Sequence, residues 1–189
     1  MSSHHIVREK QEPALLVLGL ENFPDELLGQ LLEWSPTVIA TAETADQLDS
    51  RGIKIDWIIG DVDAEMPQSD VKLLLATNGK PTLTALEFLG ENGYSSVNII
   101  TDDLQLNDYE PFINQINLVI FNGCQKIYAV SSGYSKWKSA DEGITLLLNG
   151  NNLITEGLYQ TSDKAYKTTY DGFFSLHFDD PFLFVAEDI

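Results

Sequence analysis

The sequence predicts an α/β domain, built as a parallel sheet wound with helices, followed by a small C-terminal all-β sandwich domain. Two observations predict this fold class. Strand-length apolar runs alternate with helical segments from residue 14 to residue 101, which is the pattern of a parallel sheet. From residue 124 onward, apolar runs follow one another with only turn residues between them. We therefore predict an α/β domain over residues 12–118 and a β-sandwich domain over residues 119–189.

The first domain is expected to contain five buried strands, each a short apolar run between turn residues. These are residues 14–18, 37–40, 57–59, 71–76 and 97–101. Three helices are expected between them, at residues 24–32, 42–48 and 82–89. Pro24 suits the start of the first helix and Pro36 its end, while Thr82 is suited to cap the third.

After the alternating part, residues 108–115 are expected to form one last helix. Short strands rich in aromatic and apolar residues then follow, as in a packed β-sandwich. These are residues 118–121, 126–131, 144–148, 153–155, 173–178 and 182–187. Trp137 lies between two lysines and is expected in a loop, either as an amphipathic surface residue or as a ring that stacks on a ligand.

Composition and charge exclude several classes of function. With 189 residues the chain is long enough to bury a core, as one larger domain or two small ones. The formal charge of −18, from 11 Lys and Arg against 29 Asp and Glu, predicts no nucleic-acid partner and no adhesion to anionic membranes. Residues 1–10 lack the apolar core of a signal peptide, so a cytoplasmic location is expected. The single cysteine, Cys124, excludes an intrachain disulfide.

Two carboxylates follow directly after the buried strand at residues 57–59. Asp61 and Asp63 are spaced i, i+2 at the carboxyl end of that strand, where open α/β sheets bind ligands. Paired hard oxygen ligands at such a place suit Mg²⁺ carrying a nucleotide phosphate. The alternative is that Asp61 and Asp63 are ordinary polar turn residues after a strand, because Asp is common in turns. Asp102 and Asp103, after the fifth strand, either add to an acidic mouth or are solvated turn residues.

Three segments then carry a resemblance to a known family. Residues 55–64 read IDWIIGDVDA, residues 155–158 read TEGL, and residues 182–187 read FLFVAE. They resemble, in order, the P-D-x-I-I-G-D-x-D-S strand end, the T-x-G-L-x-W turn and the final strand of the thiamine pyrophosphokinases. The resemblance covers about residues 14–189. Enzymes of this family transfer the terminal diphosphate of ATP to thiamine, giving thiamine diphosphate, and work as homodimers.

The resemblance implies a role for seven residues of this chain. Asp61 and Asp63 would be the catalytic and metal-binding pair, and Lys80 and Thr82 would lie toward the nucleotide. On the thiamine side, it implies Glu156, Gly157 and Tyr159. The cofactors it implies are Mg²⁺ and ATP, and the partner is a small-molecule ligand, thiamine-like or a nucleotide. A homodimer is the implied assembly.

Other family motifs are incomplete in this chain. The family's D-G-G-A-N falls on residues 42–46, which read AETAD, and its G-G-R-L-D-H-T falls on residues 101–107, which read TDDLQLN. Its K-D-x-T-D keeps Thr82, but Leu83 replaces the acid that follows. The two glycines of the first motif and the arginine and the histidine of the second are therefore absent from the matching positions.

These departures bear on activity. Diphosphate transfer depends on positioning and on cations that neutralise developing charge, and removal of one such group commonly costs about 3 kcal/mol. The sequence therefore predicts a catalytically weak or inactive member that keeps the fold and binds a small-molecule ligand. Two alternatives stay open. One is an active thiamine pyrophosphokinase whose missing groups come from elsewhere in the chain, and the other is a kinase that acts on another small molecule.

Overall fold

The computed structural model describes residues 12–64, 66–76 and 79–189, and the chain forms two compact units that divide between Gly123 and Cys124. The predicted boundary after residue 118 falls inside strand β6 (Asn117–Asn122), which belongs whole to the first unit. Among the described residues, no helix has the length and apolar character needed to cross a membrane.

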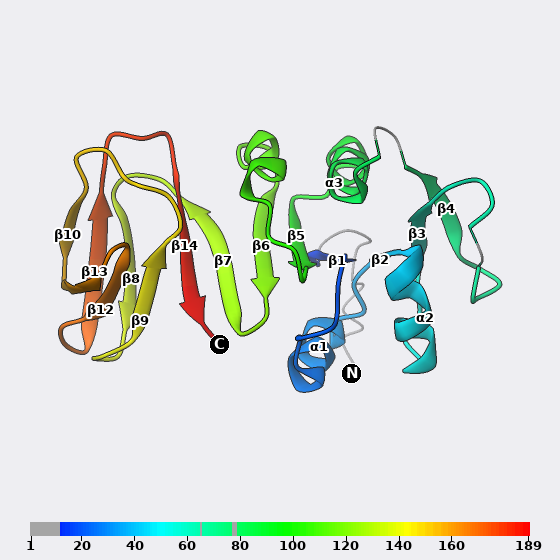
Figure 1. Ribbon diagram of the computed structural model, residues 1–189, viewed down its shortest axis with the longest axis horizontal. Helices are drawn as coiled ribbons and strands as arrows, with labels where there is room; N and C mark the ends of the chain where they lie inside the picture. Colours follow the sequence, from blue (N-terminus) through cyan, green and yellow to red (C-terminus); the bar gives the residue numbers. More distant parts are fainter. Residues whose placement is uncertain (1–11, 65, 77–78) are drawn as a thin grey trace, which may run out of the picture. The chain divides into compact units, whose positions relative to one another are not determined.

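The first unit is a six-stranded sheet in which every neighbouring pair is parallel (Figure 1). The strand order is β6-β5-β1-β2-β3-β4. The other strands are β1 (Ala14–Val17), β2 (Val38–Thr41), β3 (Trp57–Gly60), β4 (Lys72–Leu75) and β5 (Ser96–Ile100). The apolar residues of β1, β2 and β5 are buried, whereas those of β4 at the sheet edge are only partly buried or exposed. The parallel pairing of all six strands confirms the predicted parallel sheet.

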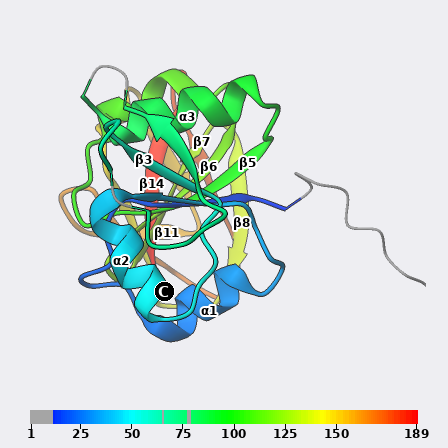
Figure 2. The ribbon, with the colours of Figure 1, turned by 90° about the vertical axis from the view of Figure 1, so that its right-hand side faces the viewer.

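Three α-helices cover the two faces of this sheet. Figure 2 shows α1 (Asp25–Leu32) and α2 (Ala42–Ser50) on one face and α3 (Pro81–Glu91) on the other. Leu28 of α1 and Leu48 of α2 are buried in one core cluster with residues of β1, β2 and β3. The helices change face because β5 pairs with the opposite edge of β1 from β2, and right-handed crossovers then place α3 on the other side. This arrangement creates a crevice at the carboxyl ends of β1 and β5.

The predicted helix at residues 108–115 is wrong. The segment instead forms two short 3₁₀ turns, Leu106–Asp108 and Glu110–Phe112. Pro111 explains the difference, because it has no N–H to donate and it disfavours the α conformation at the residue before it. The turns place Asp108 and Tyr109 at the crevice.

The second unit is a β-sandwich of two antiparallel sheets. The larger sheet has the order β11-β12-β9-β14-β7 and the smaller one β10-β13-β8. The strands of the larger sheet are β7 (Gln125–Val130), β9 (Gly143–Leu146), β11 (Leu158–Ser162), β12 (Ala165–Thr168) and β14 (Leu183–Asp188). Those of the smaller sheet are β8 (Tyr134–Lys138), β10 (Ile154–Glu156) and β13 (Gly172–His177). Residues from both sheets share one apolar core, in which Phe174 and Leu176 meet Ile144 and Val185.

The sandwich contains three strands that the sequence did not predict, β8, β11 and β12. Each is short and carries polar side chains along most of its length, so no apolar run marks it. Trp137 consequently lies on β8 and not in a loop, and it is paired with Phe173 of β13 in the register of the smaller sheet. Both residues are more than half exposed.

Candidate functional site

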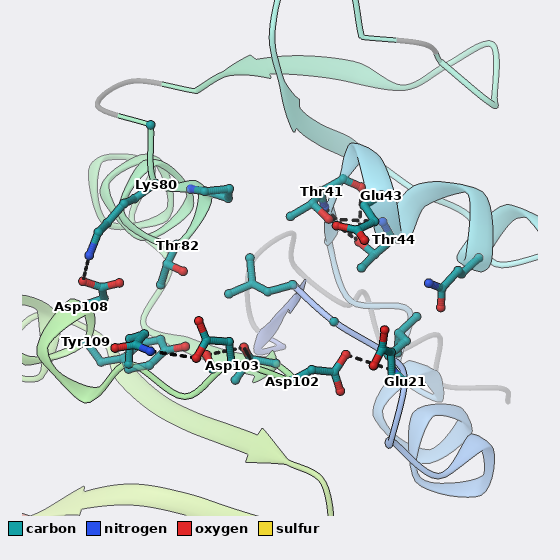
Figure 3. A pocket seen from close by; sticks show the side chains of 18 residues that line it. Glu21, Thr41, Glu43, Thr44, Lys80, Thr82, Asp102, Asp103, Asp108 and Tyr109 are labelled. Carbon is teal, nitrogen blue, oxygen red and sulfur yellow. Dashed lines mark hydrogen bonds and ion pairs between the residues drawn. The ribbon is translucent and has the colours of Figure 1, made fainter.

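A crevice of about 720 Å³ lies at the carboxyl ends of the parallel strands. It opens where β1, β2 and β5 end and where α2 and α3 begin, and its size is that of a small-molecule site. Its charged lining consists of Glu21, Glu43, Lys80, Asp102, Asp103 and Asp108 (Figure 3). The position follows from the sheet order, since ligands of open α/β sheets bind where the order reverses.

The crevice is strongly acidic. Five carboxylates and one ammonium group line it, which gives a formal charge of −4. Among the described lining residues the single cation is Lys80, and its Nζ lies 2.6 Å from Asp108 Oδ1. The Asp108 side chain is 14% exposed, so the pair is partly shielded from water. Lys80 is therefore already neutralised by the protein before any ligand arrives.

The loop that follows β1 is closed by a carboxylate from the end of β5. Asp102 Oδ2 accepts a hydrogen bond of 3.0 Å from the Glu21 N–H, and Oδ1 accepts one of 3.4 Å from the Asn22 N–H. A Cβ on Gly19 would overlap Asp102 Oδ2 and would lie 2.8 Å from the Asp102 backbone nitrogen. Glycine is thus required at residue 19 so that the two strand ends can approach each other.

Substitution Gly19→Ala is expected to lower the free energy of unfolding by about 1–3 kcal/mol, because the added methyl group meets both the side chain and the backbone of Asp102. Urea denaturation measures the change. Gly29→Ala is the matched control, since Gly29 lies inside α1 with open space around it and should gain about 0.5–1 kcal/mol of stability. Equal behaviour of the two variants would contradict the close approach at Gly19.

The floor of the crevice is polar and hydrogen-bonded. Thr101 Oγ1 donates to the Asp103 carbonyl oxygen at 2.9 Å and accepts from the Asp103 N–H at 3.2 Å. Tyr109 is 1% exposed, and burial raises the pKa of its phenol to about 12. Its hydroxyl is therefore neutral near pH 7 and adds no charge to the crevice. The floor offers hydroxyl and carbonyl groups, while the charge comes from the acidic rim.

The two helix starts at the crevice differ. The start of α2 is closed by its own side chains, since Thr41 Oγ1 accepts from the Thr44 N–H and Thr44 Oγ1 donates to the Val17 carbonyl. At the start of α3, the cap residue Lys80 makes no side-chain cap hydrogen bond, and Thr82 lines the crevice. The first turn of α3 is thus the place where this crevice offers backbone N–H groups to a ligand atom.

Asp61 and Asp63 lie outside the lining of this crevice. Both are exposed in the turn after β3, which the hydrogen bond from the Ala64 N–H to the Asp61 carbonyl closes at 3.0 Å. Within residues 12–64, 66–76 and 79–189, no group of three or more His, Cys, Asp or Glu side chains could hold a metal ion. The structure therefore brings Lys80 and Thr82 to the crevice but does not bring Asp61 and Asp63 into its lining.

The three residues implied for thiamine lie in the second unit. Glu156 ends β10 and accepts a 3.3 Å hydrogen bond from Ser175 Oγ, while Tyr159 lies on β11 and donates to Asp141 Oδ1 at 2.9 Å. The hydrogen bond to Asp141 raises the pKa of Tyr159. Gly157 has φ +70°, and a Cβ there would lie 2.8 Å from the Phe173 carbonyl oxygen. The fold thus explains Gly157 without a ligand.

Sequence reasoning missed most of the crevice. Glu21, Glu43 and Asp108 are not among the residues that the sequence predicts for the site, and for Asp102 the sequence allows either a mouth or a turn residue. The signal that points to Glu21 and Asp102 is their place just after the first and fifth strands. These positions indicate a shared site only when β1 and β5 are known to be neighbours in the sheet.

Solved structures of thiamin pyrophosphokinases share the architecture of this chain. That from Bacillus subtilis superposes with a TM-score of 0.64 at 14% identity, covering 93% of this chain and 98% of that one. The enzyme from Geobacillus thermodenitrificans gives 0.67 at 12% identity, with 93% and 97% covered. That from Candida albicans gives 0.66 at 12% identity, with 94% and 90% covered.

Comparison of sequences alone gives no match. No protein-family model matches the chain, and no curated protein matches it. At 12–14% identity the structural likeness concerns the fold and not the activity. The chain therefore has the thiamine pyrophosphokinase fold, an α/β unit followed by a β-sandwich, as its sequence motifs predicted.

Proposed function

We propose that this protein binds a small molecule in the acidic crevice. The preferred ligand is a cationic or neutral molecule of the thiamine type. Diphosphate transfer from ATP is weak or absent. The observation that carries the proposal is the charge of the crevice. Five carboxylates line it, and the ammonium group of Lys80 is paired with Asp108. The homodimer implied by the resemblance and the cytoplasmic location expected from residues 1–10 belong to the same proposal.

Electrostatics disfavours a triphosphate in such a crevice. Two like charges about 6 Å apart repel each other by about 3 kcal/mol at an effective dielectric constant of about 20. A triphosphate brings several negative charges toward five carboxylates, and the described lining offers no unpaired cation in return. Because phosphoryl transfer is accelerated mainly by cations placed on the transferred group, catalysis suffers more than binding does. The positively charged thiazolium ring of a thiamine-type ligand is instead attracted by these carboxylates.

A second function is supported by two features. Asp61 and Asp63 are exposed carboxylates at a strand end, a donor pair suited to Mg²⁺ when water and phosphate oxygens complete its coordination. The first turn of α3, with Lys80 and Thr82, offers donors to a phosphate group. A kinase acting on another small molecule through Mg-ATP would use these groups. The phosphate group of such a substrate must compete with the Asp108 carboxylate for the ammonium group of Lys80.

A coupled assay for AMP release with thiamine, ATP and Mg²⁺ tests the proposal. We expect the rate to equal that of an Asp61→Asn/Asp63→Asn double variant, because neither protein positions the triphosphate. The thiamin pyrophosphokinase of Candida albicans is the positive control. Turnover of about 1 s⁻¹ or more that disappears in the double variant would show an active enzyme and overturn the proposal.

A further inference from the structure

We propose that the Asp102 carboxylate is a resident anion, which fills the position where the loop after β1 would otherwise bind a phosphate group, and so sets the crevice to reject anionic ligands. The inference rests on the proposed function and names the residue that determines the ligand class. It concerns residues 19–22, which connect β1 to α1, and residue 102, which follows β5.

The geometry is that of an occupied anion site. Two consecutive backbone N–H groups, those of Glu21 and Asn22, point at the two oxygens of one carboxylate, at 3.0 and 3.4 Å. Gly19 lets that carboxylate lie directly over the backbone, as glycine does where a phosphate approaches a loop. Figure 3 shows Asp102 pointing toward the loop that carries Glu21. A phosphate oxygen would need the same two donors and the same space above Gly19.

The location explains why this occupation matters for the ligand. In doubly wound folds the loop after the first strand is the usual phosphate-binding element, because its N–H groups and the switch point face the same crevice. Here the same loop lines the crevice through Gly19, Leu20 and Glu21. With its donors taken by Asp102, the loop presents a negative charge where it would otherwise present two N–H groups.

Asp103 provides a matched comparison within the same segment. It lines the same crevice and carries the same charge as Asp102. Its carboxylate, however, accepts a hydrogen bond from Gln105 Nε2 at 2.8 Å, and its backbone is hydrogen-bonded to Thr101. No hydrogen bond from the β1 loop to the Asp103 side chain is present among the described residues. Removal of Asp103 therefore changes the net charge of the crevice without uncovering the Glu21 and Asn22 donors.

The test is a titration of the full chain with inorganic phosphate, without metal, followed by the amide signals of Glu21 and Asn22 in two-dimensional NMR spectra. In the unaltered protein both signals are expected to stay in place. In Asp102→Ala they are expected to shift saturably, with an affinity at least about tenfold higher than in Asp103→Ala, because two charge-assisted hydrogen bonds become available. Asp102→Ser, whose shorter side chain cannot span both donors, serves if the alanine variant does not fold.

Three results would overturn the inference. One is an equal response of Asp102→Ala and Asp103→Ala, which would show that only the net charge matters. Another is a saturable shift of both amides in the unaltered protein, since the loop would then bind phosphate despite Asp102. The last is a folded Asp102→Ala or Asp102→Ser protein whose two amides ignore phosphate. Because the assay uses phosphate alone, its failure leaves the AMP-release result for the proposed function to be judged separately.

Discussion

Substitution Lys136→Met is expected to lower the free energy of unfolding of the β-sandwich by about 2–3 kcal/mol. Lys136 Nζ lies 2.6 Å from Glu187 Oε2, and Glu187 is only 6% exposed. Loss of one partner of a buried ion pair commonly costs about 3–5 kcal/mol, because the other charge is left without compensation. We expect less here, since Lys138 Nζ lies 3.6 Å from the same oxygen and the Tyr128 hydroxyl donates to Oε1.

This cluster joins the two sheets of the sandwich. Glu187 is on β14 and Tyr128 on β7 of the larger sheet, while Lys136 is on β8 of the smaller sheet. Tyr134, also on β8, donates to the Tyr128 hydroxyl at 3.1 Å. Removal of Lys136 therefore weakens the contact between the sheets as well as the charge balance of Glu187.

The dependence of stability on pH distinguishes an ionic effect from lost packing. Burial alone would raise the pKa of Glu187, but the hydrogen bonds from Lys136 and Tyr128 and the charges of Lys136 and Lys138 outweigh it, so its pKa is lowered. A carboxylate whose pKa is lowered by folding stabilises the folded protein at pH values above its unfolded-state pKa. This stabilisation is lost as the pH falls through the folded-state pKa. The difference between the unaltered protein and Lys136→Met should therefore be large near pH 7 and shrink in acid.

Chemical denaturation at about pH 7 and about pH 3 measures both effects. Lys54→Met is the control, because Lys54 forms an exposed pair with Asp56 in the other unit, and exposed pairs contribute little to stability. A Lys136→Met deficit that is the same at both pH values would mean that the loss comes from packing. Our interpretation of the cluster as a buried ionic link would then be wrong.

The second large effect is expected at the crevice, where Asp108→Asn should raise the affinity for Mg-ATP by about tenfold. The substitution removes one of five carboxylates and releases the Lys80 ammonium from its 2.6 Å partner. A released lysine at the start of α3 is well placed to meet a phosphate, since the helix dipole also favours negative charge there. An NMR titration with Mg-ATP measures the change.

The variant Lys80→Met shows whether the gain in Asp108→Asn depends on the released ammonium group of Lys80. If Asp108 holds Lys80 away from ligands, Lys80→Met changes Mg-ATP binding little on its own and removes the gain seen in Asp108→Asn. Glu110→Gln is the control for charge alone, because Glu110 is near in sequence but does not line the crevice. A tenfold loss of Mg-ATP affinity in the single variant Lys80→Met would show instead that Lys80 already serves the nucleotide.

Much of the fold was predictable because most of the parallel strands are short runs dominated by apolar residues. Residues 57–59 and 97–101, for example, were expected as buried strands, and they overlap β3 (Trp57–Gly60) and β5 (Ser96–Ile100). Strands β8, β11 and β12 could not be found in this way, because they belong to a small sandwich in which polar residues cover one face or an edge. Their positions are set by pairing with distant strands, and a local pattern does not contain that information.

The lining of the crevice was less predictable from the sequence than the fold, and the reason is topological. Asp61 and Asp63 stood out because they follow a strong apolar strand, yet the crevice forms at β1 and β5, where the sheet order reverses. The hydrogen bond between Glu21 and Asp102 joins residues 81 positions apart. No spacing rule connects them, whereas Lys80 and Thr82 were singled out by the likeness of their segment to the family's K-D-x-T-D motif, and both line the crevice.

The most direct test of this account is a pair of calorimetric titrations of the unaltered protein, one with thiamine and one with Mg-ATP. We expect saturable binding of thiamine with a dissociation constant of about 1 mM or lower, and no saturation by Mg-ATP over the same range. Micromolar binding of Mg-ATP together with no binding of thiamine would contradict the conclusion that the acidic crevice selects cationic or neutral ligands.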